Sequence, residues 1–104
     1  MEASRIFIDG KCVSARSKET MEILNPATLE RVGLAPKCGQ EDVDAAVRAA
    51  KAAQTDWAKL PGAEKAKLLH EVGAKIRKNG RELSTLMTKE TGKPLCEAVD
   101  CIEW

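Results

Sequence analysis

The side chains in this chain best suited to nucleophilic or metal chemistry are four cysteines and one histidine. The cysteines are Cys12, Cys38, Cys96 and Cys101. They form no Cys-x-x-Cys pair, and His70 has no partner spaced to share a metal ion with it. A thiol becomes a strong nucleophile where nearby charge favours the thiolate, and the sequence places no such group beside Cys38. We therefore expect reduced thiols and a surface histidine.

A second candidate is the string Glu90-Thr91-Gly92-Lys93-Pro94. It predicts a helix end, a left-handed glycine and a proline that opens a new helix. Glycine and proline occur at many connections between helices, so the string alone indicates only a corner between two helices. A carboxylate at the C-terminal end of a helix is unfavourable unless positive charge offsets it. Glu90 is therefore either a solvated carboxylate or one whose charge is offset by Lys93.

The elements that position these residues begin with short strands, at about residues 5–35. Asp9-Gly10 separates the apolar runs 5–8 and 11–15, which predicts a hairpin with a type I′ turn and positive φ at both turn residues. Residues 21–24 form a third strand that Asn25-Pro26 stops. Val32 and Leu34 alternate in a fourth strand, which we place at residues 29–34.

Helices follow from about residue 41 to residue 104. Apolar periodicity predicts a helix over 41–59 and a second that Pro61 opens. Asn79-Gly80 predicts the end of the second helix, with the glycine in left-handed conformation. A third helix covers 81–91, and a fourth begins at Pro94. The fold class is therefore an α+β fragment, with a small strand layer followed by four helices.

Composition limits the possible functions. The 104 residues carry 17 basic and 16 acidic side chains, a formal charge of +1, which argues against nucleic-acid or anionic-membrane binding. Hydrophobic residues make up 43% of the chain but aromatic residues 3%, and alanine fills little volume. We therefore expect one marginal domain with an exposed apolar face that further polypeptide covers.

The fourth helix has no stop signal before Trp104, so we expect the front piece of a longer protein.

Taken in order, several motifs resemble the N-terminal segment of the aldehyde dehydrogenase superfamily. Each motif is weakly specific, whereas the ordered series is highly specific and covers essentially the whole chain. The motifs are Ile6-Phe7-Ile8-Asp9-Gly10-Lys11, Ile23-Leu24-Asn25-Pro26-Ala27-Thr28, Glu41-Asp42-Val43-Asp44-Ala45-Ala46-Val47, Trp57, Leu68-Leu69 and Glu90-Thr91-Gly92-Lys93-Pro94.

The resemblance implies that residues 1–104 are the truncated N-terminal part of a Rossmann-like cofactor-binding domain in an α/β parent. Such a parent oxidises a small aldehyde to a carboxylic acid with NAD or NADP, through a cysteine nucleophile and a glutamate base. Betaine aldehyde, succinate semialdehyde and lactaldehyde dehydrogenases all remain open. The family's catalytic and cofactor-binding motifs match no position here. Cys38-Gly39-Gln40 reverses the order of the family's Gly-Gln-x-Cys string, so we expect the chain alone to be inactive.

The resemblance also implies two sites to which this segment contributes. A monovalent cation, K⁺ or Na⁺, would take the carboxylate of Glu90 and the backbone carbonyls of Ile23 and Leu24, since hard cations prefer oxygen ligands. Cys101 lies near a position that borders the substrate tunnel; the alternative is a small buried cysteine without a role.

The implied partners are the remainder of the parent chain and the aldehyde substrate, in a cytoplasmic homo-oligomer with no nucleic acid and no membrane. A different class of function stays open beside the enzyme: a stand-alone structural or interaction module derived from the same family.

Overall fold

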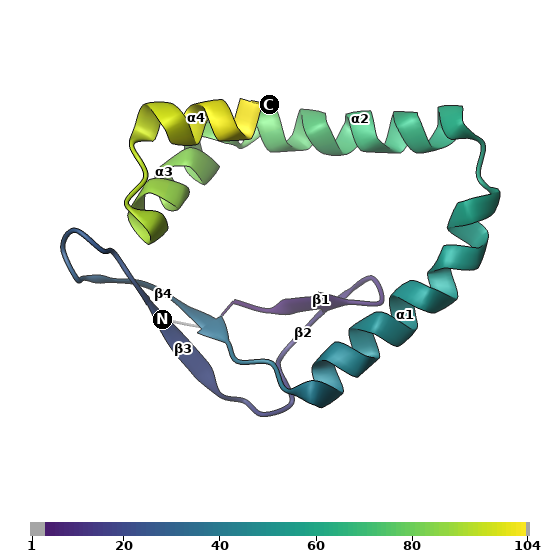
Figure 1. Ribbon diagram of the computed structural model, residues 1–104, viewed down its shortest axis with the longest axis horizontal. Coiled ribbons are helices and arrows are strands. Elements are labelled where there is room, and N and C mark those ends of the chain that lie inside the picture. Colours follow the sequence, from purple (N-terminus) through teal and green to yellow (C-terminus); the bar gives the residue numbers. More distant parts are fainter. Residues whose placement is uncertain (1–3, 104) are drawn as a thin grey trace. The chain divides into compact units, whose positions relative to one another are not determined.

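The computed structural model describes residues 4–103 and has four short strands followed by four helices (Figure 1). The chain divides into two compact units. The first contains Met1–Ile23 and Gly33–Lys59, and the second contains Leu24–Val32 and Leu60–Trp104. The expected α+β order, strands first and four helices after, is confirmed.

The first unit starts with an antiparallel hairpin of β1, Ile6–Ile8, and β2, Lys11–Val13, in which Phe7 pairs with Cys12. Asp9 and Gly10 have φ of 52° and 73°, so the prediction of positive φ at both turn residues is confirmed. Helix α1, Gln40–Lys59, contacts β1. Four alanines on α1 and the residues of the hairpin turn line a small hollow, because alanine lets the turn approach the helix: Ala46, Ala49, Ala50 and Ala53.

The N-terminus of α1 is held by the carboxylate of Asp42. Asp42 is 5% exposed, and its Oδ2 accepts a hydrogen bond of 3.1 Å from the backbone N–H of Gly39. Its Oδ1 also accepts one of 3.2 Å from the N–H of Arg16. Asp42 thus satisfies an otherwise unpaired donor at the start of the helix and ties the segment after β2 to α1.

Strands β3, Thr20–Leu24, and β4, Arg31–Pro36, form the second strand pair. The prediction that the fourth strand starts at residue 29 is wrong. Leu29 has φ of 60°, and its N–H donates to the carbonyl of Asn25 at 2.8 Å, so it belongs to the turn. The side chain of Asn25 also accepts the N–H of Ala27 at 2.9 Å, an Asx turn that explains why β3 stops where Asn-Pro predicts.

The second unit contains three helices: α2, Gly62–Lys78, α3, Gly80–Thr91, and α4, Leu95–Glu103. Helices α3 and α4 have the most extensive contact, and α4 also contacts α2. The predicted left-handed glycine between α2 and α3 is wrong. Asn79 separates the helices with φ of −101° and ψ of 12°, and Gly80 is already the first residue of α3. The side chain of Asn79 closes α2 by donating to the carbonyl of Lys75 at 2.9 Å.

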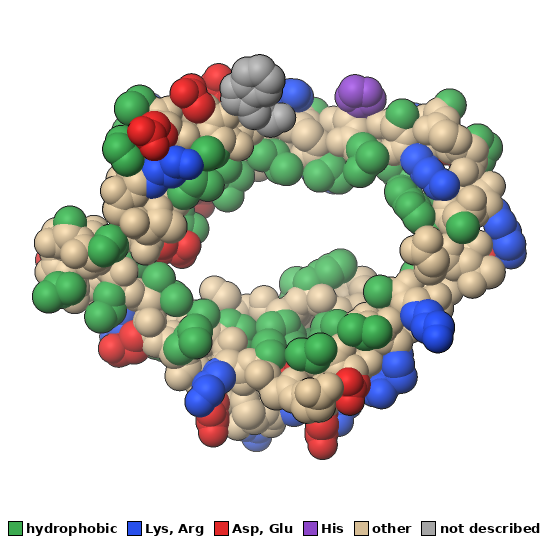
Figure 2. Space-filling model, viewed as in Figure 1, with side chains coloured by type: hydrophobic (Ala, Val, Ile, Leu, Met, Phe, Trp, Pro, Cys, Tyr) green, Lys and Arg blue, Asp and Glu red, His purple; other side chains and the backbone are tan. Residues whose placement is uncertain are grey.

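The described residues bury little apolar volume. Ala15 and Ala98, 4% and 0% exposed, are the buried hydrophobic residues among them. The apolar face of α2 is uncovered, with Leu69, Val72 and Ile76 exposed by 63%, 52% and 40%. Figure 2 shows hydrophobic side chains at the surface of this helix. The expected exposed apolar face is therefore present. Within residues 4–103, no helix has the length and hydrophobicity needed to cross a membrane.

Candidate functional site

The α3–α4 corner, residues 90–94, has the geometry that its sequence predicts. Gly92 is left-handed with φ of 75°, and its N–H donates to the carbonyl of Thr88 at 2.9 Å, which ends α3. The hydroxyl of Thr91 accepts the N–H of Lys93 at 3.2 Å. The carbonyl of Pro94 then accepts the first helical bond of α4, from Ala98. Gly92, Lys93 and Pro94 thus each have a backbone group in a hydrogen bond, so the connection between α3 and α4 is ordered.

This corner meets the Asn-Pro turn that was singled out separately in the sequence. A Cβ atom added to Gly92 would lie 2.9 Å from Cγ of Pro26. Carbon atoms do not approach so closely, so only glycine leaves room for the proline ring. Two motifs 66 positions apart in the sequence are thus packed against each other within the second unit.

Lys93 and Cys101 form the closest pairing of reactive groups at the corner. The ammonium Nζ of Lys93 donates to Sγ of Cys101 at 2.7 Å. This hydrogen bond, together with the charge of Cys101, raises the pKa of Lys93; the nearby carboxylate of Glu97 acts in the same direction, and partial desolvation opposes them. Lys93 therefore faces α4, and it is Cys101 that it contacts.

The predicted cation ligands lie in different parts of the structure. Glu90 is exposed in the last turn of α3, and its carboxylate forms no hydrogen bond or ion pair with residues 4–103. Ile23 and Leu24 are the last two residues of β3, whereas Glu90 lies in α3. The oxygen atoms of all three residues are the ligand type that a hard monovalent cation accepts, so the donor chemistry fits the prediction.

The other predicted residues are accessible. Cys101 is exposed in the part of the chain that the structure describes. Cys38 and His70 are also exposed, and all four cysteines are free thiols. Sequence analysis missed the pairing of Lys93 with Cys101. Lys93 precedes α4, so helical periodicity places it on no face, and only the path of the chain around the corner brings the two groups together.

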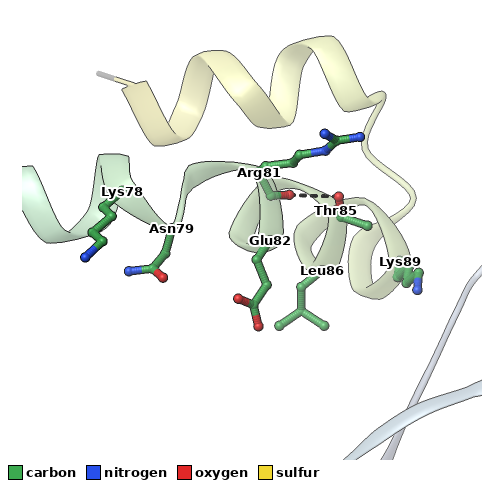
Figure 3. Close-up of a pocket in the computed structure, with 7 residues that line it drawn as sticks. All are labelled: Lys78, Asn79, Arg81, Glu82, Thr85, Leu86 and Lys89. Carbon is green, nitrogen blue, oxygen red and sulfur yellow. Dashed lines mark hydrogen bonds between the residues drawn. The ribbon is translucent and has the colours of Figure 1, made fainter.

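Two hollows lie along α3. The first, about 540 Å³, is open, and its side chains do not converge: in Figure 3 Arg81 lies on the α4 side of the helix, whereas Glu82 and Leu86 point away from α4. The second, about 650 Å³, lies between α3 and α4 with apolar side chains from α4 and the guanidinium groups of Arg77 and Arg81 in its lining. Both linings include a hydroxyl and a carboxylate, but the hydroxyls of Ser84 and Thr85 donate to backbone carbonyls and to no carboxylate.

The side chain of Ser84 is buried between α3 and α4. Ser84 is 1% exposed and donates to the carbonyl of Gly80 at 2.7 Å, with the carbonyl of Ala98 at 3.5 Å. A buried hydroxyl with such partners is a satisfied structural group and no activated nucleophile. The described residues therefore provide an ordered corner and a thiol next to an ammonium group, without a set of groups for aldehyde oxidation.

Comparison with known proteins gives a consistent result. The family model described as "Aldehyde dehydrogenase family" matches residues 12–103. The chain is 41% identical over 101 residues to aminoaldehyde dehydrogenase 2 of Solanum lycopersicum, covering 95% of this chain and 20% of that protein. It is 42% identical over 104 residues to a chloroplastic aminoaldehyde dehydrogenase of Arabidopsis thaliana, covering 95% and 21%.

The same similarity holds in three dimensions. An aldehyde dehydrogenase of Bacillus cereus, solved as its NAD⁺ complex, superimposes with a TM-score of 0.89 at 37% identity. The superposition covers 95% of this chain and 21% of that one. The chain thus spans about a fifth of the length of the relatives that it matches.

Proposed function

The chain belongs to the aldehyde dehydrogenase family, and from this membership we propose that it is the N-terminal part of the cofactor-binding domain of an NAD(P)-dependent enzyme that oxidises an aldehyde to a carboxylic acid. One observation carries the proposal. Nearly the whole chain superimposes on a dehydrogenase solved with NAD⁺, yet it spans only 21% of that protein. Its contribution is then structural: it supplies helices and the α3–α4 corner to a domain that is completed by the remainder of the parent chain.

The exposed apolar faces support this role. Leu69 and Val72 on α2 and Val47 on α1 are each more than half exposed. Exposure of so many large apolar side chains is unfavourable in water, because complete burial of one such side chain contributes about 1.5–3 kcal/mol and a half-exposed one gains only part of this. Polypeptide from the rest of the parent would cover them. A stand-alone interaction module is less well supported, because the matched relatives are all several times longer.

The chemical class of the substrate follows from the relatives. The two similar plant proteins are aminoaldehyde dehydrogenases, so we propose a small aldehyde that bears an amino group as the substrate of the parent. NAD or NADP would be held by residues outside this segment. A cytoplasmic homo-oligomer is the corresponding proposal for the parent.

A segment exchange tests the proposal. Residues 12–103 of this chain replace the matching segment of the tomato aminoaldehyde dehydrogenase, and reduction of NAD⁺ is measured with an aminoaldehyde and with an aldehyde that lacks the amino group. We expect aldehyde-dependent NADH formation by the chimera and none by the 104-residue chain alone. A folded chimera without activity, or activity of the isolated chain, would contradict the proposal.

The monovalent cation site is a further part of the proposal. We expect the carboxylate of Glu90 and the carbonyls of Ile23 and Leu24 to contribute ligands for K⁺ or Na⁺. The melting temperature of the chimera should then rise with KCl or NaCl more than with a bulky organic cation at equal ionic strength. Glu90→Ala should remove this difference, whereas Glu82→Ala, on the same helix, should keep it. An unchanged salt response in Glu90→Ala would exclude Glu90 as a ligand.

A further inference from the structure

The groove between α3 and α4 combines an uncovered apolar stripe with two guanidinium groups. Leu95, Val99 and Ile102 recur on α4 at the spacing of one helical face. Leu95 is 52% exposed, and the other two are partly exposed. Arg77, in the last turn of α2, and Arg81, in the first turn of α3, line the same groove. The groove is therefore an apolar surface bordered by positive charge.

Neither guanidinium group forms an ion pair with a carboxylate in residues 4–103. Glu103 also lines the groove, but it is not paired with either arginine within the described residues. The side chain of Glu82, the neighbour of Arg81, points away from α4 (Figure 3). Arg81 also lies near the positive end of the α3 dipole, where a cation is unfavourable. A carboxylate in the groove would thus be attracted by both arginines.

Covering the apolar stripe would remove water from the two arginines as well. A guanidinium group keeps its charge at neutral pH, and a buried charge without a partner is strongly unfavourable. A carboxylate satisfies a guanidinium group through two parallel charge-assisted hydrogen bonds. A surface that fits this groove therefore needs apolar side chains next to an aspartate or a glutamate.

We propose that the α3–α4 groove receives a segment of the parent enzyme, outside residues 1–104, whose apolar side chains flank an aspartate or glutamate that pairs with Arg77 or Arg81. This inference rests on the proposed function, in which the matched relatives extend far beyond this chain; the chain covers 20% of the tomato protein. The stripe from Leu95 to Ile102 is about 10 Å long, a length that suits the side chains of a packed helix or strand.

Photo-cross-linking in the chimera with the tomato enzyme identifies the occupant of the groove. A benzophenone amino acid replaces Leu95, and the cross-linked peptides are identified by mass spectrometry after irradiation. We expect a cross-link within one chain to a peptide that lies outside the exchanged segment and contains an aspartate or glutamate. A cross-link to a second subunit, a cross-link confined to residues 12–103 or the absence of a cross-link would overturn the inference.

Formation of NADH by the same chimera reports the proposed function separately. An active chimera without the expected cross-link overturns the inference alone. A folded, inactive chimera with the expected cross-link contradicts the proposed function alone.

Charge variants of the chimera test the pairing itself. Arg77→Gln or Arg81→Gln should lower the melting temperature by about 2 °C or more, because the buried carboxylate loses its partner. Lys89→Gln, on α3 but outside the lining of the groove, should change it by less than about 1 °C. In the isolated chain, where the groove is uncovered, all three variants should have similarly small effects.

Reversal of both charges provides the rescue experiment. Arg81→Glu alone should lower the melting temperature of the chimera more than Arg81→Gln does. Replacement of the cross-linked aspartate or glutamate by arginine in the Arg81→Glu background should recover at least about half of that loss. If neither arginine substitution destabilises the chimera more than Lys89→Gln, the incoming segment does not pair with this groove through a carboxylate.

Discussion

At the residue scale, Gly92 is subject to two independent constraints. Its φ of 75° is unfavourable for residues with a Cβ atom, and a Cβ there would come within 2.9 Å of Pro26. The first constraint follows from the helix end and can be read from the local sequence. The second depends on a turn far away in the sequence.

Gly92→Ala should therefore destabilise the second unit. The left-handed conformation costs alanine about 1–2 kcal/mol, and the contact with Pro26 adds to this value. Urea unfolding followed by circular dichroism measures the change in free energy. Gly73→Ala is the control: that glycine lies inside α2, where a Cβ would lie 3.7 Å from the guanidinium of Arg77, an ordinary van der Waals contact. It should stabilise the helix by about 0.5–1 kcal/mol. Equal effects of the two changes would contradict the packing at the corner.

Asp42 offers a second prediction at this scale. Asp42→Ala leaves the N–H groups of Arg16 and Gly39 without their acceptor and should destabilise the first unit by about 1–3 kcal/mol. Asp42→Asn keeps one acceptor oxygen and should cost less. Hydrogen exchange at the amides of residues 16 and 39 measures the loss of protection locally. Asp56→Ala, in an exposed pair with Lys59, should leave both amides unchanged.

At the element scale, the helix boundaries show which signals are local. The α3–α4 corner formed as predicted because glycine and proline act on their own backbone positions. Asn79-Gly80 contains the same kind of signal, yet the helix resumes at once at Gly80. The side chain of Asn79 closes α2 through the carbonyl of Lys75, so a left-handed glycine is not required. The sequence predicts that α2 ends there but not how the chain continues.

The contact between α3 and α4 depends on small residues. Ala98 is fully buried, so Ala98→Leu should force the helices apart and cost about 1–3 kcal/mol through overpacking. Urea unfolding of the variant gives the value. Cys96→Leu adds a comparable side chain at an exposed position of α4 and should change stability by less than about 0.5 kcal/mol. If Ala98→Leu is equally neutral, the two helices do not pack as described.

At the scale of the whole molecule, large apolar side chains remain exposed on α1 and α2. A chain with few buried hydrophobic residues and many exposed ones should associate in solution to cover them. This is the property that links the physical chemistry of the isolated chain to its proposed place in a longer enzyme.

The double substitution Leu69→Gln with Val72→Gln should reduce concentration-dependent association of the chain in sedimentation experiments. Because both side chains are more than half exposed, the unfolding free energy at low concentration should change little. In the dehydrogenase chimera the same change should lower the melting temperature, since the face would then be buried. Glu71→Gln, at an exposed position between the two, is the control. A chimera as stable as its parent would show that this face stays open to solvent.

The amino-acid sequence alone determined the order of the elements, the Asp9-Gly10 hairpin, the left-handed Gly92 and the likeness to a dehydrogenase segment. These features depend on turn residues, periodicity and motif order, which act over short stretches of chain. Tertiary structure alone decided that Pro26 lies against Gly92, that Asp42 binds the backbone of Arg16 and that Lys93 reaches Cys101. Each of these contacts joins residues from different elements, and such contacts depend on how the chain packs, which local preferences do not specify.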